Sequence, residues 1–268
     1  KRYNEMKILD KIVEDKKIEI NKLLSNSSIS KLENSHLFSR KCISLKESIK
    51  NNNSGIICEF KRRSPSNQNI NYISSLSDVV SGYEEAGAAG LSILTNKKYF
   101  DGDTQDIIDI RDISNLPILR KEFIISEYQV IEAKSIGSDA ILLIASILSE
   151  EEIIGYSSLA KSIGLEVLLE IHSEDELYKI SGDDIDIVGV NNRNLDTLEI
   201  DLNNSIELYG KIPSKFVKIS ESGISEVESI LKLKEVGYNG FLIGEKFMIT
   251  NNPMESAYDF IKKIENEI

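Results

Sequence analysis

From residue 56 onward, short apolar runs alternate with longer stretches in which apolar and charged residues are mixed. Runs of three to five residues rich in Ile, Leu and Val predict strands of a parallel sheet that is buried on both faces. Eight such strands are predicted, at Ile56–Phe60, Leu91–Leu94, Pro117–Arg120, Ala140–Ile144, Val167–Ile171, Ile187–Val190, Phe216–Ile219 and Phe241–Ile243.

The mixed stretches between these runs have the spacing of amphipathic helices. Glycines such as Gly137 and Gly164 follow several of them, as expected where a left-handed residue ends a helix. Eight alternating units without a break predict an α/β protein with a closed (β/α)8 TIM barrel. The alternative, an open doubly wound sheet, usually carries a glycine-rich dinucleotide loop, and none follows Phe60. The clearest predicted helices are Ser77–Ala86, Ser126–Ile136, Ser149–Ile163 and Ser225–Val236.

The first 55 residues have a different pattern. Apolar residues recur at helical spacing between Lys, Glu and Asp over residues 3–24, which predicts an amphipathic helix. Residues 25–55 are rich in Ser, Asn and Lys, which predicts short helices and loops. We therefore expect residues 1–55 to form a helical extension that packs on a barrel of residues 56–268, all within one structural domain.

Composition and charge narrow the class of protein. The formal net charge of −12 disfavours nucleic acids and anionic membranes as partners. No apolar run approaches the roughly 20 residues of a membrane helix. Cys42 and Cys58 are too few for a disulfide framework, so we expect free thiols in a reducing cytoplasm. No spaced set of ligands predicts a metal site, and His36 and His172 are expected at the surface or in loops.

Polar side chains gather where the predicted strands end. In a (β/α)8 barrel these carboxyl ends meet at one mouth, where the catalytic groups lie. A single charged residue at a strand end is usually solvated, but six strand ends carry such groups in this chain. Glu59 and Lys61 are two residues apart and therefore share a face of an extended strand. The other groups are Lys121, Glu170, Asn191, Arg193, Glu221, Ser222 and Glu245.

Two of these strand ends predict a phosphate site. Glu221–Gly223 and Gly244–Glu245 follow the seventh and eighth strands, where barrels frequently bind phosphate. Glycine lets backbone N–H groups approach an anion closely, and a helix N-terminus adds positive potential. The position and the residue types together predict a phosphorylated substrate.

Six segments together resemble the motifs of indole-3-glycerol phosphate synthases, in the same order and with the same spacing. The resemblance extends from about Ile8 to about Met248, and the first- and sixth-strand motifs together are specific to that family. The matching segments are Ile57–Ser66, Ser92–Thr95 with Tyr99–Gly102, Pro117–Ile124, Glu166–Glu170, Gly189–Leu195 and Ser220–Ile224.

The resemblance implies a reaction that needs no metal and no redox cofactor. The family closes the ring of 1-(2-carboxyphenylamino)-1-deoxy-D-ribulose 5-phosphate, releasing carbon dioxide and water, and forms indole-3-glycerol phosphate for tryptophan biosynthesis. Lys121 matches the general acid of the family, Glu170 its general base, and Lys61 a second proton donor near the substrate carboxylate. An apolar strand would raise the pKa of Glu170, while nearby lysines would lower it.

The remaining matches imply binding and orienting roles. Glu59, Asn191 and Ser222 would orient the reacting groups and the sugar hydroxyls. Phe123 would form an apolar wall for the aromatic ring, and Arg193 would order the mouth through ion pairs. The residues that would border the phosphate are Ser64, Gly223, Gly244 and Glu245, and Glu221 is expected among the residues that bind substrate or phosphate.

Two other functions fit parts of the sequence. One is a neighbouring phosphate-binding barrel, the isomerase acting one step earlier, which would use a Cys/Asp acid–base pair. Cys58 would then have to point into the mouth, but its place next to Glu59 predicts the opposite face. The other is a non-catalytic binding module, which the retained Lys121, Glu170 and Asn191 argue against. We expect a monomer or a weak homo-oligomer that binds a small phosphorylated anthranilate–ribulose substrate.

Overall fold

Eight parallel strands form a closed barrel in the computed structural model, which describes residues 7–26, 28–195 and 197–268. Each strand pairs with the next one in sequence, and the eighth pairs with the first. The predicted barrel is confirmed, and each predicted strand agrees with an observed one to within two residues at either end. The strands are β1 (Ile56–Phe60), β2 (Gly90–Leu94), β3 (Ile118–Lys121), β4 (Ala140–Ile144), β5 (Glu166–Ile171), β6 (Ile187–Asn191), β7 (Val217–Glu221) and β8 (Gly240–Ile243).

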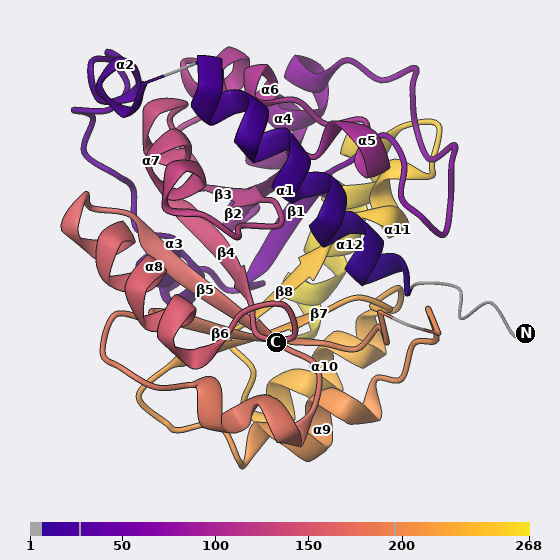
Figure 1. Ribbon diagram of the computed structural model, residues 1–268. Coiled ribbons are helices and arrows are strands. Elements are labelled where there is room, and N and C mark those ends of the chain that lie inside the picture. Colours follow the sequence, from indigo (N-terminus) through magenta and orange to yellow (C-terminus); the bar gives the residue numbers. More distant parts are fainter. Residues whose placement is uncertain (1–6, 27, 196) are drawn as a thin grey trace, which may run out of the picture.

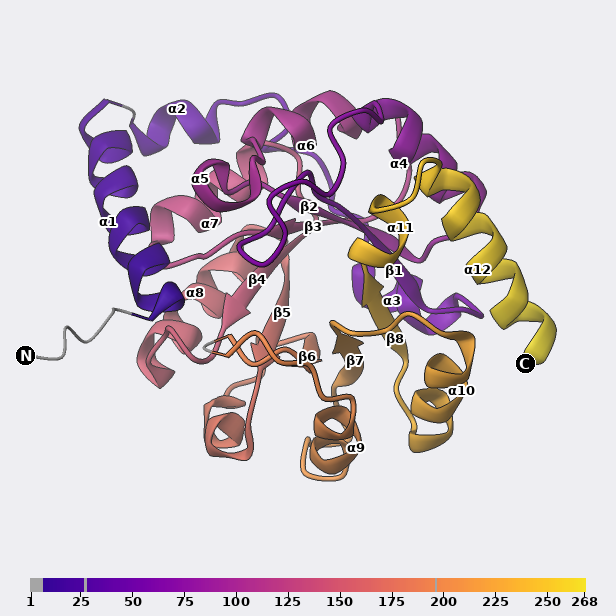
Figure 2. The same ribbon diagram turned by 90° about the vertical axis from the view of Figure 1, so that its right-hand side faces the viewer.

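Helices surround the strands (Figures 1 and 2). The serines at the start of two predicted helices, Ser126 and Ser149, are N-caps whose side chains accept a backbone N–H of the first turn. Among the described residues, no helix is long and apolar enough to cross a membrane. The outer helices are α4 (Leu76–Glu85), α6 (Thr104–Arg111), α7 (Glu127–Ser135), α8 (Glu150–Ser162), α9 (Asn203–Tyr209), α10 (Val227–Val236) and α12 (Pro253–Glu267).

Three connections at the carboxyl ends of the strands contain short helical turns. The β2–α6 connection contains α5 (Lys97–Phe100), and β8 is followed by α11 (Glu245–Met248). The connection from β5 to β6 contains only a 3-10 helix, η1 (Glu174–Lys179), in place of the α-helix that a regular unit would have. These connections leave the mouth of the barrel lined by loops and short turns.

The two-residue period of the strands sorts side chains into an inner and an outer layer. On β1, Ile56, Cys58 and Phe60 belong to the core shared with the outer helices, and Ile57 belongs to the core inside the barrel. Glu59 has the same parity as Ile57 and therefore also faces the interior. The inner layer is apolar near the amino ends of the strands and charged near their carboxyl ends.

The N-terminal extension covers both ends of the barrel. It consists of α1 (Ile8–Asn26), α2 (Ile29–Glu33) and α3 (Leu45–Asn51), and the part of the predicted helix at residues 3–6 lies outside the described residues. Helix α1 crosses in front of the strands in Figure 1. Leu45 and Ile49 of α3 are buried in the inner core, next to the first residues of β2 and β8, and so fill the opposite end of the barrel.

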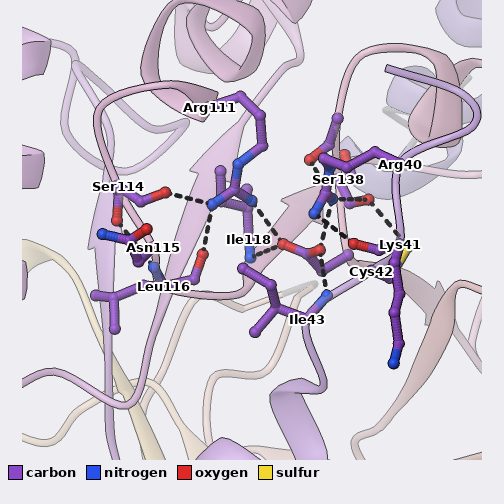
Figure 3. A network of polar contacts seen from close by, with 12 residues as sticks. Arg40, Lys41, Cys42, Ile43, Arg111, Ser114, Asn115, Leu116, Ile118 and Ser138 are labelled. Carbon is purple, nitrogen blue, oxygen red and sulfur yellow. Dashed lines mark hydrogen bonds and ion pairs between the residues drawn. The ribbon is translucent and has the colours of Figure 1, made fainter. Parts of the chain in front are cut away.

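A buried carboxylate at the amino end of β4 ties the extension to the barrel (Figure 3). Asp139 is fully buried and accepts hydrogen bonds from Arg111 Nη1 (2.7 Å) and Arg40 Nη2 (2.6 Å). It also accepts from the backbone N–H groups of Ile43 and Ile118, each at 2.8 Å. Because four donors surround this one carboxylate, its charge is compensated where water cannot reach it.

We expect Asp139→Asn to destabilise the protein by roughly 3–5 kcal/mol, because it leaves the buried Arg111 guanidinium without its counter-ion. Urea unfolding measures the loss, and the exposed Asp183→Asn, which breaks a surface pair, is the control with a change below about 0.5 kcal/mol. An equal loss of stability in both variants would contradict this account.

Candidate active site

The carboxyl ends of the strands and helix α1 enclose a cavity of about 500 Å³. Its floor is made of the charged inner-layer residues, and Ile8, Leu9 and Ile12 of α1 form part of an apolar wall. The cavity brings together all the site residues that the sequence singles out. They are Glu59, Lys61, Ser64, Lys121, Phe123, Glu170, Asn191, Arg193, Glu221, Ser222, Gly223, Gly244 and Glu245.

A partly buried lysine between two carboxylates occupies the floor of this cavity. Lys121 Nζ, at the end of β3, lies 3.1 Å from Glu170 Oε2 and 2.5 Å from Glu221 Oε2. Asn191 Nδ2 donates to the second oxygen of Glu170 at 3.2 Å. Gly189 makes room for this group, because a Cβ there would lie 2.3 Å from Glu221 Oε1. The last residues of β3, β6 and β7 and the next-to-last residue of β5 thus meet at one point, as the barrel geometry requires.

The position of Glu221 differs from the one inferred from sequence. The sequence groups Glu221 with the phosphate-binding turn, but it is the last residue of β7 and its side chain faces the interior. Its carboxylate is 1% exposed and lies beside Lys121, not beside the backbone N–H groups of the turn. Glu221 therefore belongs to the charged floor of the cavity.

A second lysine–carboxylate pair lies next to the first. Lys61 Nζ, one residue beyond β1, is 3.0 Å from Glu59 Oε1, and Ser92 Oγ donates to Glu59 Oε2 at 3.2 Å. Glu59 is buried, whereas the Lys61 side chain is 15% exposed and reaches the cavity. Two ammonium groups are therefore available to a substrate in this cavity.

Mutual attraction in a poorly hydrated site sets the protonation states. Burial opposes the charged form of Lys121, but the carboxylates of Glu221 and Glu170 outweigh this effect and raise its pKa. Burial likewise opposes ionisation of Glu170, but Lys121, His172 and Asn191 hold its pKa well below the ordinary value. The sequence left open whether burial would raise the pKa of Glu170 or nearby lysines would lower it. In the structure the effect of Lys121 prevails, and the pKa is lowered. Without substrate, Lys121 is an ammonium and Glu170 a carboxylate.

Glu221 has the opposite shift. Burial raises the pKa of Glu221 to about 7, and the neighbouring Glu170 charge adds to the rise, against the attraction of Lys121. One oxygen of Glu221 is buried without a hydrogen-bond partner among the described residues, in keeping with incomplete stabilisation of its charge. The two carboxylates beside Lys121 therefore have unequal proton affinities, a property of acid–base sites.

The turn after β7 has an unusual backbone. Ser222 and Gly223 both have left-handed conformations, with φ of 68° and 75°. Such a conformation is strained for a serine and needs support from its surroundings. Asn192 Nδ2 gives that support, since it donates to the carbonyls of Glu221 (3.0 Å) and Ser222 (3.2 Å). A Cβ at Gly223 would lie 2.2 Å from Ile200 Cγ2, so glycine is required there.

The turn after β8 completes this side of the cavity. A Cβ at Gly244 would lie 2.6 Å from Glu59 Oε1, so glycine lets the backbone approach the floor. Arg193 Nη2 lies 3.7 Å from Glu245 Oε2 across the mouth, and Lys246 also lines the cavity. Two glycine turns with cationic side chains nearby suit a phosphate group.

Hydrogen bonds close the loop after β1. Ser64 and Asn67 exchange two backbone hydrogen bonds, of 2.7 and 3.1 Å, and Asn67 N also donates to Ser64 Oγ at 3.1 Å. Gln68 Nε2 donates to the Ser64 carbonyl at 3.0 Å. Side-chain hydrogen bonds therefore fix this loop and hold Ser64 at the cavity.

The aromatic wall has one more member than the sequence analysis proposed. Phe123, two residues after Lys121, lines the cavity with Phe100 of α5, and their ring centroids are 6.2 Å apart. Offset aromatic pairs of this kind present flat apolar surfaces. Phe100 belongs to the Tyr99–Gly102 segment that resembles the family. Its position in the sequence did not indicate that its ring lies next to that of Phe123.

The positions of His172 and Cys58 test two predictions made from the sequence. His172 was expected at the surface or in a loop; it is the first residue of the loop after β5, but its side chain is only 13% exposed and its Nε2 lies 3.2 Å from Glu170 Oε1. Cys58 is buried in the outer core with Val79 and Tyr83 and does not line the cavity. Its predicted orientation is confirmed, which removes the thiol that an isomerase of the Cys/Asp type would need.

A (β/α)8 barrel with paired lysines and carboxylates beside two glycine turns defines an enzyme for acid–base chemistry on a small anionic substrate. Within the described residues, no group of three or more His, Cys, Asp or Glu is placed to hold a metal ion. Solved structures with the same fold include a tryptophan synthase alpha-subunit mutant from Pyrococcus furiosus, with a TM-score of 0.60, 15% identity, and coverage of 80% of this chain and 98% of that one.

Sequence comparison identifies the family. A sequence model of the indole-3-glycerol phosphate synthases matches residues 9–260. Relatives with that name include one from Bacteroides thetaiotaomicron, 44% identical over 96% of this chain and 99% of the relative. Another, from Acetivibrio thermocellus, is 39% identical over 94% and 98% of the two chains. The chain belongs to the indole-3-glycerol phosphate synthase family, carboxy-lyases of tryptophan biosynthesis.

The raised pKa of Glu221 predicts a pH-dependent contribution to stability. Between its ordinary pKa of 4.5 and about 7, the folded protein keeps a proton that the unfolded chain has released. The free energy of unfolding should therefore fall as pH rises through this range, by up to about 1.4 kcal/mol per pH unit. Urea unfolding of wild type and of Glu221→Gln at pH 5, 6 and 7 isolates this slope. A constant difference between the two proteins across the range would refute it.

Proposed function

We propose that the chain converts 1-(2-carboxyphenylamino)-1-deoxy-D-ribulose 5-phosphate to indole-3-glycerol phosphate, with Lys121 as general acid and Glu170 as general base. The observation that carries this proposal is the Lys121–Glu170 pair, with a distance of 3.1 Å, on the floor of a cavity with a phosphate-type turn at one side. The charged floor, the aromatic wall and the glycine turns of the cavity suit, in that order, the ketone and carboxylate, the aromatic ring and the phosphate of this substrate.

Carbon–carbon bond formation needs an acid at the ketone. When the aromatic carbon that bears the carboxylate attacks the ketone carbon, negative charge develops on the ketone oxygen. Lys121 can donate a proton to that oxygen, and its raised pKa ensures that it holds one at neutral pH. Lys61 also lines the cavity and would pair with the substrate carboxylate before carbon dioxide leaves.

Loss of water completes the ring. Carbon dioxide leaves with the electrons returned to the aromatic ring, and the former ketone oxygen is then a hydroxyl group. This hydroxyl leaves as water after protonation by an ammonium group, while a base removes a proton from the adjacent ring carbon. Glu170 would be the base in that step, and the hydrogen bond from Asn191 to its other oxygen supports this role. The acid and the base act on neighbouring carbons.

Binding of the rest of the substrate follows from the cavity walls. The backbone at Gly223 and Gly244, with Ser64 and Glu245 nearby, would surround the phosphate, and Arg193 would order the mouth through its ion pair. Phe123 would contact the aromatic ring, while Glu59 and Ser222 would orient Lys61 and the sugar hydroxyls. The free thiols of Cys42 and Cys58 are consistent with activity in the cytoplasm. Sedimentation of the purified chain tests whether it is a monomer or a weak homo-oligomer.

Lys121→Ala should lower turnover by about 100-fold or more, because it removes the proton donor to the ketone. Appearance of indole fluorescence measures the reaction with little background, because the chain has no Trp. Lys50→Ala, which removes a surface ammonium from α3, is the matched control and should keep wild-type turnover. No indole formation by wild type would favour a non-catalytic binding module, and near-wild-type turnover of Lys121→Ala would remove the proposed acid.

Gly223→Ala should raise the KM for substrate by about 10-fold with a smaller effect on kcat. A left-handed alanine costs about 1–2 kcal/mol, and its Cβ would collide with Ile200, so the phosphate-binding turn must shift. Steady-state kinetics measures the change. Gly155→Ala is the control, because a Cβ at this helical position has open space and should leave both constants unchanged. A normal KM in Gly223→Ala would show that this turn does not bind the phosphate.

A further inference from the structure

His172 is a buried charged group that the proposed reaction leaves unexplained. It follows β5 directly, and its spacing of two residues from Glu170 directs both side chains to the same face. Its Nε2 lies 3.2 Å from Glu170 Oε1, and its Nδ1 lies 3.7 Å from Glu176 Oε2. The imidazole therefore lies between two carboxylates, one on β5 and one on η1.

The backbone around His172 is fixed on two sides. Its N–H donates to Glu176 Oε2 at 2.6 Å, so that carboxylate contacts both the backbone and the ring of the same residue. Its carbonyl accepts from Asn204 Nδ2 of α9 at 3.0 Å. These hydrogen bonds hold the backbone of His172, while its ring nitrogens contact Glu170 and Glu176 at ion-pair distances without a hydrogen-bond partner among the described residues.

The surroundings of His172 are predominantly acidic. Burial opposes protonation, but Glu170 and Glu176 outweigh this effect and raise the pKa of His172 to about 9. Lys121 and Asn191 approach Glu170 from its remaining sides, at 3.1 and 3.2 Å. The charged and polar groups around the Glu170–His172 pair are Glu176 on η1, Lys121 on β3, Asn191 on β6, Asn204 on α9 and Glu221 on β7.

The need for this second partner follows from the role of Lys121. Within the described part of the chain, the cationic side chains within ion-pair distance of Glu170 are Lys121 and His172. Lys121 must turn toward the ketone of the substrate when it acts as the acid, and this weakens its hold on Glu170. Asn191 is neutral, so the Glu170 carboxylate would otherwise face the substrate without a counter-ion.

We propose that His172 is a positioning residue for the reaction: its ion pair with Glu170, supported by Glu176, keeps that carboxylate oriented and ionised after Lys121 engages the substrate. The inference rests on the proposed role of Glu170 as the general base. It assigns to His172 no proton transfer with the substrate. It also gives Glu176, outside the cavity, an indirect role in the reaction.

The test is the pH dependence of kcat/KM for His172→Gln, which keeps an amide donor but removes the positive charge. Loss of the charge raises the pKa of Glu170, so the acidic limb should move to higher pH. The fall in kcat should be about 10-fold or more at pH 6 and smaller at pH 8, with KM within about threefold of wild type. His36→Gln, which changes the other histidine of the chain at an exposed site, should have the wild-type profile.

Glu176→Gln supplies a second variant that keeps the ring and the acceptor for the backbone N–H. It should lower the pKa of His172, which nitrogen NMR shifts report directly, because the chain has only two histidines. The basic limb of kcat/KM should move to lower pH with it. A parallel profile of His172→Gln at all pH values, or a His172 that titrates together with His36, would overturn the proposal. The pH profile requires a wild-type enzyme that forms the indole product, whereas the NMR titration does not, so both results are distinct from failure of the proposed function.

Discussion

The ion cluster of Lys121, Glu170 and Glu221 is the constraint on which the site depends. Lys121 lies beside two carboxylates inside a barrel where water has little access, and burial would oppose the charges of Lys121 and Glu170 if the two groups were not paired. This pairing also fixes the protonation states of both groups. The Lys121 ammonium keeps its proton, and the Glu170 carboxylate stays ionised. In the proposed reaction, substrate groups would take over part of this pairing, which would link catalysis to the correct ligand.

The two ends of the barrel use buried charge for different purposes. Asp139, at the amino end, has four donors and no group left to react, so its network serves stability. Glu221, at the carboxyl end, keeps one buried oxygen without a hydrogen-bond partner among the described residues. An incompletely satisfied group has a shifted pKa and can change its protonation near neutral pH. The same fold thus separates a fully compensated end from a reactive one.

Much of the fold and the membership of the site could be predicted from sequence. Continuous apolar runs determine the strands, and strand parity with barrel closure places Glu59, Lys121 and Glu170 at one mouth. Sequence could not decide whether burial or the lysine controls the pKa of Glu170, because that depends on a distance of 3.1 Å. The contact of His172 with Glu170 was not predicted. The spacing of two residues indicated a shared face, but the alternation of a strand was not expected to continue beyond its last residue. Glu221 was misplaced because a strand end and a turn are continuous in sequence.

The N-terminal extension belongs to the chemistry of the site as well as to the fold. Lys16 of α1 is buried and lies 3.2 Å from Glu122 Oε2, the residue next to Lys121, while the apolar residues of the same helix line the cavity. Glu122 also accepts hydrogen bonds from Thr95, Asn96 and the N–H of Phe123, so the end of β3 is held on several sides. A helix that covers the mouth lowers the local dielectric constant, which strengthens every ion pair beneath it. The shifted protonation states of the floor therefore depend on a segment that precedes the barrel in sequence.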